Sequence, residues 1–345
     1  MGVDLKDLVP KREIDLRELS GRAIAIDAYN ALHQFLAIIR QPDGTPLMDS
    51  RGRVTSHLSG LFYRTVNLLE LGIKPVYVFD GKPPEVKELV MLRRKAHKEE
   101  AERKYEEALA RGDLKAARTY AQQTGKLTDE AVDEAKRLLE ALRVPWVQAP
   151  SEGEAQAAYM AIRGDVYAAA SQDYDSLLFG APRLVRNITI TGRRKLPRKD
   201  VYVEVKPELI ELELLLRELE ITREQLVDVG ILVGTDYNPE GVKGVGPKKA
   251  VKLIKEHGTL EQALAALGES KPPFDIEEVR RAFLSPEVTS NYSLKWGEPD
   301  EAEVVKLLCR EHDFSEDRVL NALGRALKAF REGRGRVTLE AFFHA

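Results

Sequence analysis

Three short apolar segments, each closing on an aspartate, limit the folds open to this chain. They are residues 22–27 (Arg-Ala-Ile-Ala-Ile-Asp), 74–80 (Lys-Pro-Val-Tyr-Val-Phe-Asp) and 166–173 (Val-Tyr-Ala-Ala-Ala-Ser-Gln-Asp). None alternates between polar and apolar residues, which is typical of strands buried on both faces of a parallel sheet. Because ligands bind outside the carboxyl ends of such strands, we expect the three aspartates at a functional crevice.

Helical periodicity fills the intervals between these segments. The apolar spacing predicts helices over residues 31–39, 56–71, 130–142 and 154–162. A hairpin is expected around residues 191–193, and from Lys206 onward the chain is expected to be almost all helix. We therefore predict an α/β fold with a mainly parallel central sheet flanked by helices.

The composition excludes several classes of protein. A length of 345 residues, with 43% hydrophobic and 32% charged, describes a globular chain with a large core. No stretch approaches the roughly 20 apolar residues of a membrane span, and the start lacks a secretory signal, so we expect a cytoplasmic protein without membrane association. The single cysteine, Cys309, excludes an intrachain disulfide, and the 6 histidines show no spacing typical of zinc ligands.

The net charge hides an uneven distribution. The chain has 53 basic and 56 acidic residues, a balance of −3. The basic residues gather in 82–104, 193–199 and 243–255. Since nucleic-acid binding depends on where positive charge lies, this balance does not exclude a nucleic-acid partner.

Seven carboxylates form the leading candidate site: Asp27, Asp80, Glu152, Glu154, Asp173, Asp175 and Asp236. Any one of them could instead be a helix N-cap. Two like charges about 5 Å apart repel by roughly 3 kcal/mol at an effective dielectric of about 20, so such a cluster needs divalent cations. Ligands that are all oxygen favour Mg²⁺ or Mn²⁺, and two such ions can activate a water and neutralise the leaving oxygen of a phosphodiester.

A glycine-rich turn is the second candidate site. Residues 241–250 read Gly-Val-Lys-Gly-Val-Gly-Pro-Lys-Lys-Ala, and Pro247 suits the first turn of a helix whose free amides can bind a phosphate. Lys248, Lys252 and Lys255 share one helical face. The turn is neither a P-loop nor a dinucleotide fingerprint. Such turns are also common as plain structural features, but the lysine face favours phosphate binding.

Taken together, these motifs resemble the flap endonuclease family in its archaeal form. The resemblance covers nearly the whole chain and rests on Ala25-Ile-Asp27, Val78-Phe-Asp80-Gly-Lys-Pro-Pro84, Pro150-Ser-Glu152-Gly-Glu154, Ser171-Gln-Asp173-Tyr-Asp175 and Gly234-Thr-Asp236-Tyr followed by Gly244-Val-Gly246-Pro-Lys-Lys. It implies a Mg²⁺-dependent nuclease that removes 5′ DNA flaps in replication and repair, with associated 5′–3′ exonuclease activity and two-metal-ion hydrolysis. In the family Asp27, Asp80, Glu152 and Glu154 would surround the first metal, with Asp173, Asp175 and, more remotely, Asp236 around the second.

The resemblance also divides the chain. It implies an N-terminal nuclease region at 1–128 with a helical arch at about 84–128, an internal nuclease region at 129–330 with a helix-hairpin-helix-type motif at about 226–258, and a flexible tail at 331–345. In the family the free 5′ end threads through the arch.

The arch segment is rich in charge. Pairs such as Glu100 with Lys104 at i,i+4 predict helix, and Lys87 and Arg94 match the family's phosphate-steering positions. The alternative for these residues is an ordinary solvated, ion-paired surface.

Further DNA contacts are implied by the match at Gly2, His33, Arg40, Arg64, Gly244, Gly246, Lys248, Lys249 and Lys252. Residues 40–55 would form a wedge that bends the DNA and accommodates a one-nucleotide 3′ flap. His33 stands where eukaryotic members have a tyrosine that stacks on a nucleobase, although a helical histidine is more often structural. Backbone carbonyls of residues 241–246 would bind K⁺.

The C-terminal residues resemble a sliding-clamp-binding peptide through Leu339, Phe342 and Phe343, with Arg336 in place of the usual glutamine. The expected partners are therefore branched DNA with a 5′ flap and, separately, a sliding clamp. The protein itself is expected to be a monomer. Two alternatives stay open: a relative that acts on bubbles, gaps or long 5′ ends, and a clamp-bound, junction-recognising module without catalysis. The second would be expected to lack metal ligands, whereas all seven carboxylates are present.

Overall fold

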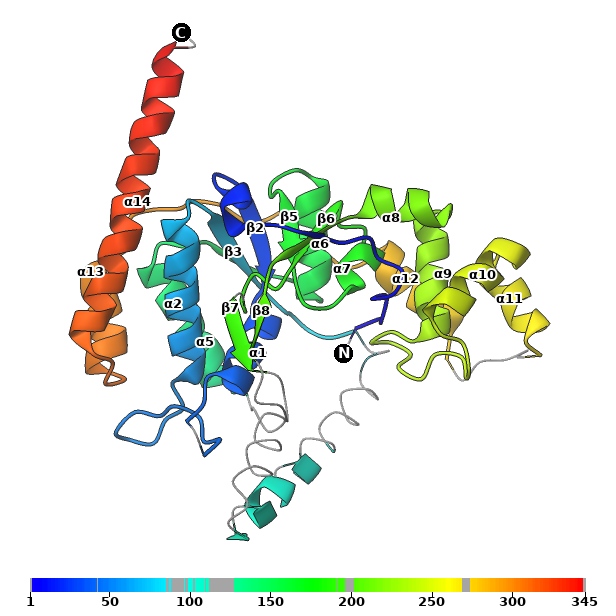
Figure 1. The fold of residues 1–345 in the computed structure, drawn as a ribbon, viewed down its shortest axis with the longest axis horizontal. Coiled ribbons are helices and arrows are strands. Elements are labelled where there is room, and N and C mark those ends of the chain that lie inside the picture. The colour runs from blue at the N-terminus through cyan, green and yellow to red at the C-terminus, as the bar shows by residue number, and fades with distance from the viewer. Residues whose placement is uncertain are drawn as a thin grey trace.

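The computed structural model describes residues 2–41, 43–84, 87, 96, 99–101, 103–108, 110–111, 127–190, 192–195, 202–268 and 274–343. A seven-stranded sheet in the order β1-β9-β6-β5-β2-β3-β4 forms the centre of the molecule (Figure 1). Its strands are β1 Arg12–Glu13, β2 Ala23–Asp27, β3 Lys74–Phe79, β4 Trp146–Gln148, β5 Ala168–Ala170, β6 Arg183–Arg186 and β9 Glu208–Glu211.

The sheet is mainly parallel, as predicted. Strand β2 pairs in parallel with β3 and β5, and the parallel pairing continues outward to β4 and β6. Only β9 runs antiparallel, to both β6 and β1. The three predicted strands are β2, β3 and β5, so their carboxyl ends meet at one edge.

Both faces of the sheet are covered, which explains the apolar segments. Ala25, Val76 and Val78 pack into one hydrophobic cluster with α6 Gly153–Ile162, α7 Asp175–Leu178 and α9 Arg223–Val233. Ile24, Ile26 and Tyr77 point the other way, into a second cluster with α1 Ala28–Ile38, α2 Ser56–Glu70, α5 Asp129–Ala141 and α14 Glu316–Phe343. A strand buried on both faces has no position for a polar side chain.

The four predicted helices are α1, α2, α5 and α6, with ends that differ from the prediction by up to three residues. Their starts follow from side-chain caps. Asp27 accepts a hydrogen bond from the Asn30 amide at 2.9 Å to begin α1, and Thr128 accepts one from the Ala131 amide at 3.2 Å to begin α5.

One local prediction is right in part and another is wrong. Strands β7 Gly192–Lys195 and β8 Tyr202–Val205 pair antiparallel, which confirms a hairpin here, but Gly192 and Arg193 lie within its first strand and not in its turn. The chain after Lys206 is not almost all helix, because β9 adds to the sheet and residues 286–300 have no regular structure. Leu209 and Ile210 of β9 are buried against the sheet, and this packing overrides helical propensity.

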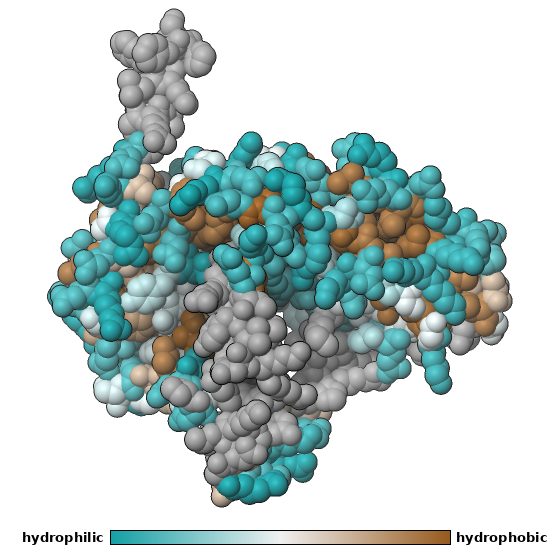
Figure 2. Space-filling model, viewed as in Figure 1, coloured by the Kyte–Doolittle hydropathy of each residue, from teal (hydrophilic) through white to brown (hydrophobic). Residues whose placement is uncertain are grey.

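A group of small helices lies at one end of the molecule (Figure 1). It contains α8 Leu212–Leu219, α9, α10 Pro247–His257, α11 Leu260–Ala266 and α12 Ile276–Leu284. Arg280 of α12 links three of these helices. Its Nε lies 2.7 Å from Asp228 Oδ1 of α9, and its Nη1 lies 2.6 Å from Glu261 Oε1 of α11. Figure 2 shows mostly polar side chains on this face, with apolar side chains gathered near α8 and α9.

The last helix, α14, follows α13 Glu301–Val305 and packs against α2 before it projects from the body (Figure 1). It continues through the segment expected as a tail, and the side chains of residues 333–343 lie outside the description. The clamp-binding role of Leu339, Phe342 and Phe343 therefore stays a prediction. Among the described residues, no helix is both long and apolar enough to cross a membrane.

Candidate active site

The predicted carboxylates gather at the edge where the parallel strands end. Asp27 closes β2, Asp80 directly follows β3, and Asp173 and Asp175 follow β5. Since β2 lies between β3 and β5 in parallel register, these ends adjoin. The other three come from helix termini: Glu152 is the N-cap of α6, Glu154 lies in its first turn, and Asp236 follows α9.

Electrostatic coupling between Asp27 and Asp80 shows how close the carboxylates lie. Burial raises the pKa of Asp27 well above its usual value, and the charges of Asp80 and Asp173 raise it further. Burial, with the charge of Glu152 next, raises the pKa of Asp80 to about 6. Ionisation of these two acids is therefore opposed by burial and by the charges of neighbouring carboxylates.

Neighbouring carboxylates also affect the pKa values of Glu154 and Asp175. Burial raises the pKa of Glu154 well above its usual value, followed by the charges of Asp175 and Asp173. Burial raises the pKa of Asp175 to about 7, and Asp236 contributes to that shift. All seven predicted carboxylates therefore belong to one connected cluster.

Hydrogen bonds from the backbone and one amide side chain orient the first group. The Gly153 amide donates to Asp80 Oδ1 at 2.6 Å. A Cβ at Gly153 would lie 2.7 Å from that same oxygen, so only glycine allows the approach. Asn30, whose backbone amide donates to the N-cap residue Asp27, also donates from Nδ2 to Asp173 Oδ2 at 3.3 Å.

The first residues of the chain close the other side of the cluster, as expected for Gly2. The Val3 amide donates to Asp175 Oδ1 at 2.7 Å. A Cβ at Gly2 would lie 2.7 Å from Asp175 Oδ1 and 2.8 Å from Asp173 Cβ. Val3 and Leu5 are buried, which fixes this segment against the body.

Lys87 reaches into the carboxylate cluster. Its Nζ lies 2.7 Å from Glu152 Oε2 and 3.3 Å from Asp236 Oδ2, and 5.7 Å from the centroid of the Tyr237 ring. Burial favours the neutral amine, but Glu152 and Asp236 outweigh it and raise the pKa of Lys87 above its ordinary value. The second predicted basic residue, Arg94, lies outside the described residues.

The cluster suits hard divalent cations, although its side chains are not closed around an ion. Within the described part of the chain, no three or more His, Cys, Asp or Glu side chains are grouped as a ready metal site. Repulsion between the carboxylates opposes such closure, and the Lys87 ammonium already supplies one positive charge. The donors are all carboxylate oxygens. Neighbouring carboxylates help to raise the pKa values of Asp27, Asp80, Glu154 and Asp175, and bound cations would relieve that repulsion.

The remaining residues predicted on the N-terminal region lie at several places. His33 is half-buried on α1. Arg40 donates from Nε to the Leu36 carbonyl at 2.8 Å and from Nη1 to the Gly44 carbonyl at 2.9 Å, which braces the loop after α1. Arg64 is half-buried, and burial lowers its pKa.

The glycine-rich turn has the predicted form. Gly244 takes a φ of 74°, Gly246 is the N-cap of α10, and Pro247 is its first residue. A Cβ at Gly244 or Gly246 would meet no atom within 4 Å, so the backbone there is open to a ligand. The predicted lysines, Lys248, Lys249 and Lys252, are exposed beside this turn.

Several polar contacts to the cluster were not predicted from the sequence. Ser176 Oγ donates to Glu154 Oε1 at 3.4 Å, and Gln148 Nε2 donates to the Asp80 carbonyl at 2.6 Å. Gln148 is the last residue of β4, so it could have been predicted as a polar side chain at the sheet edge where the carboxylates lie. Asn30 was detectable as well, three residues after an aspartate that begins a helix.

Comparison with known proteins agrees with this geometry. Residues 1–101 match the family model of the XPG N-terminal domain, and residues 143–236 match that of the XPG I-region. Flap endonuclease 1 of Hyperthermus butylicus is 64% identical over 335 residues, covering 96% of both chains. Flap endonuclease 1 of Staphylothermus marinus is 58% identical over 349 residues, covering 99% of this chain and all of its own length.

Solved structures give the same result. Flap endonuclease-1 from Methanococcus jannaschii superposes with a TM-score of 0.76 at 43% identity, covering 96% of this chain and 100% of that one. The catalytic core of Rad2 in complex with DNA substrate shares the fold, with a TM-score of 0.68 at 23% identity over 94% of this chain and 100% of that one. The chain therefore belongs to the flap endonuclease family and is a nuclease.

Proposed function

We propose that this nuclease is a structure-specific 5′ flap endonuclease, with associated 5′–3′ exonuclease activity, that acts in DNA replication and repair. The observation that carries the proposal is the convergence of seven carboxylates, from five separate segments, on the sheet edge that Lys87 enters. Full-length relatives named flap endonuclease 1 support the flap substrate, and the catalytic core of Rad2, solved in complex with DNA substrate, supports DNA as the substrate class.

Two Mg²⁺ ions would bind within this cluster, with Mn²⁺ as a substitute. Asp27, Asp80, Glu152 and Glu154 would hold one ion, and Asp173, Asp175 and Asp236 the other. When bound, such ions lower the pKa of a water and offset charge on the leaving oxygen of a phosphodiester.

Groups of the chain itself would orient the carboxylates and position the phosphate. The amides of Asn30, Gly153 and Val3 fix carboxylate oxygens of Asp27, Asp80 and Asp175 before any ion arrives. Lys87 stays protonated, since its pKa is raised, and its ammonium can bind a phosphate oxygen at the same place. Arg94 would act beside it.

DNA would bind on both sides of the cluster. The turn at residues 241–246, with Lys248, Lys249 and Lys252, would hold one duplex arm through open backbone and exposed lysines, and its carbonyls would bind K⁺. Gly2 would lie beside the scissile phosphate. His33, Arg40 and Arg64 would serve the junction between single and double strands. The enzyme would act as a cytoplasmic monomer, with residues 336–343 bound to a sliding clamp.

An end-labelled double-flap oligonucleotide tests this proposal. Wild-type enzyme should cut it at the flap junction with Mg²⁺ and not in EDTA. Asp175→Ala and Asp80→Ala should still bind the substrate but lose cleavage by about three orders of magnitude or more. Glu218→Ala, on an exposed side chain of α8, is the matched control and should cut normally.

Two results would contradict the proposal. A wild-type chain that binds the flap without Mg²⁺-dependent cleavage would be a recognition module and not an enzyme. Affinity for the flap that does not fall with salt would exclude phosphate contacts, because neutralised phosphates give a log–log slope of several units.

A further inference from the structure

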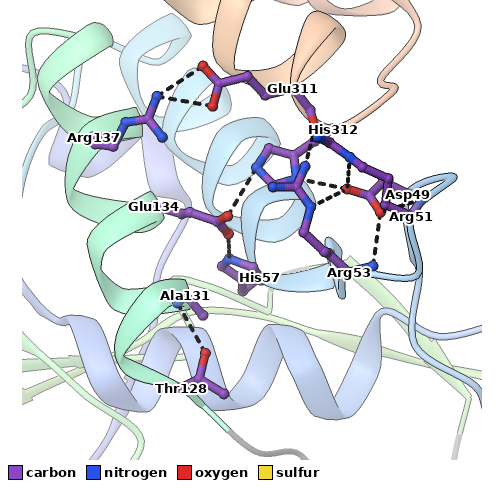
Figure 3. Close-up of polar contacts among 10 residues, drawn as sticks. All are labelled: Asp49, Arg51, Arg53, His57, Thr128, Ala131, Glu134, Arg137, Glu311 and His312. Atoms are coloured by element: carbon purple, nitrogen blue, oxygen red, sulfur yellow. Dashed lines mark hydrogen bonds and ion pairs between the residues drawn. The ribbon is translucent and has the colours of Figure 1, made fainter.

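A buried polar junction that contains none of the seven carboxylates joins three distant parts of the chain (Figure 3). Its centre is Glu134 of α5. Oε2 of Glu134 lies 3.2 Å from Nε2 of His57 on α2, and Oε1 lies 3.2 Å from Nε2 of His312, which precedes α14. The side chains of His57 and His312 are 2% and 0% exposed, so water does not replace these contacts.

The junction continues from His312 into the loop that precedes α2. Nδ1 of His312 lies 3.1 Å from Arg53 Nη2 and 3.4 Å from Asp49 Oδ2. The Asp49 side chain has no exposed surface, and its oxygens accept bonds from the Arg51 amide at 3.0 Å and from Nε of Arg53 at 2.7 Å. Asp49 therefore folds the loop, and His312 connects the folded loop to Glu134.

Further hydrogen bonds connect the loop to residues 311–313. The Ser50 amide donates to Asp313 Oδ2 at 2.7 Å, and the guanidinium groups of Arg51 and Arg53 donate to the Glu311 carbonyl. Glu311 is in turn paired with Arg137 of α5 at 3.0 Å (Figure 3). Residues 311–313 therefore hold the loop in place.

The two histidines contact Glu134 in different ways. His57 Nε2 and Glu134 Oε2 are within hydrogen-bond distance at 3.2 Å, and His57 Nδ1 has no hydrogen-bond partner. His312 Nε2 lies 3.2 Å from Glu134 Oε1 as an ion-pair contact without hydrogen-bond geometry. Burial favours protonated Glu134, but contacts with His312 and His57 outweigh it and lower its pKa to about 2. One carboxylate therefore contacts two buried imidazole rings.

The loop presents apolar side chains on its outer side. Met48 and Val54 form an antiparallel bridge and are 46% and 36% exposed. Exposed apolar side chains such as Met can act as wedges against stacked bases where DNA bends. We propose that Glu134 is a positioning residue for residues 47–55: through His312 it fixes where this loop meets branched DNA. This inference rests on the proposed function and adds a residue that does not touch the substrate.

Steady-state kinetics of Glu134→Ala on a double-flap substrate tests the inference. Without the carboxylate, two buried imidazole rings lose their partner and the loop loses its anchor, so KM should rise roughly tenfold while kcat stays within about twofold. Glu134→Gln should recover most of the loss. Its amide oxygen can accept a hydrogen bond from one imidazole ring, and its NH₂ can donate one to the other.

The matched control is Glu130→Ala, an exposed glutamate on the same helix, which should leave KM unchanged. A Glu134→Ala enzyme with a lower Tm but wild-type KM would overturn the positioning role, as would a Gln variant no better than Ala. If Glu134→Ala does not fold, His312→Gln keeps a donor to Glu134 and loses the Arg53 contact. An unchanged KM in His312→Gln would equally overturn the inference. Failure of wild-type cleavage would instead remove the proposed function itself.

Discussion

The backbone amide of Val3 donates a hydrogen bond to Asp175 Oδ1 at 2.7 Å, so the first residues of the chain form one wall of the carboxylate cluster. Gly2 lies so close to Asp173 and Asp175 that an added methyl group would overlap them. The space beside these two carboxylates is therefore set by the absence of a side chain.

Gly2→Ala should reduce cleavage for this reason. The new Cβ must displace Asp173 or Asp175, and we expect kcat/KM to fall by about 10- to 100-fold, because a displacement of about 1 Å is costly in a preorganised site. Titration with Mg²⁺ should show weaker metal binding, so that half-maximal cleavage needs a higher Mg²⁺ concentration than in the wild type. Gly324→Ala, in α14 with no neighbour near its Cβ, is the control and should cleave normally. Equal activity of the two variants would contradict the packing at Gly2.

Lys87 should oppose cation binding while it assists cleavage. Its ammonium lies among the oxygens that would receive the metals, so Lys87→Met should bind Mn²⁺ several-fold more tightly in the absence of DNA. Cleavage of the flap should nevertheless fall, by about two orders of magnitude, since the phosphate loses a positive partner. Titration of the DNA-free protein with Mn²⁺, followed by electron paramagnetic resonance, separates the two effects. Lys82→Met, on an exposed lysine nearby, should change neither.

The metal-free enzyme should lose stability as the pH rises. The folded-state pKa values of Asp80 and Asp175 are raised to about 6 and about 7 from an ordinary 3.8, so folding favours their protonated forms. Their contribution is complete below about pH 4 and is lost as the pH passes through 6 to 7. Between about pH 5 and 7.5 in EDTA, the free energy of unfolding should fall on the order of 3 kcal/mol.

Chemical denaturation at both pH values measures this change, and Mg²⁺ should cancel it by binding the ionised cluster. Glu134 acts in the opposite direction, since its pKa is lowered from 4.5 to about 2, but only below this window. Stability that increases from about pH 5 to 7.5 in EDTA would show that the carboxylates are not buried together.

Arg280 should be a main support of the small helices that carry the glycine-rich turn. Its guanidinium binds both oxygens of the buried Asp228, at 2.7 and 3.0 Å. Arg280→Met leaves that carboxylate unpaired, and we expect the free energy of unfolding to drop by about 3 kcal/mol. Thermal denaturation of Arg281→Met, which removes an exposed arginine from the same helix, gives the comparison. Equal Tm values for the two variants would contradict this role.

The sequence predicted the elements that carry a strong local pattern. Strands β2 and β3 are five or six residues of uninterrupted apolar character, and the carboxylates that follow them are recognisable by position. The short strands β4 and β9 have only three and four residues, too few to show a period of two. Their identity comes from pairing with distant strands.

The contacts between distant segments could not be predicted. Lys87 was assigned to phosphate steering, but its ion pairs with Glu152 and Asp236 depend on how three elements pack. Likewise His57 and His312 have no ligand spacing in the sequence, and only the fold brings both to Glu134. Buried polar networks of this kind are set by tertiary structure, and no local motif marks them.

The strand order has a consequence for how the chain could be divided. Strands β2 and β3 come from the first part of the sequence, while their partners β5 and β4 come from the second. If the polypeptide were expressed as two pieces separated between β3 and α5, each piece would hold unpaired strand edges and an incomplete set of acids. Asp27 and Asp80 would be on one, and the other five on its complement. Only co-folding of the two halves would restore turnover, so a split-protein complementation assay would report directly on assembly of this sheet.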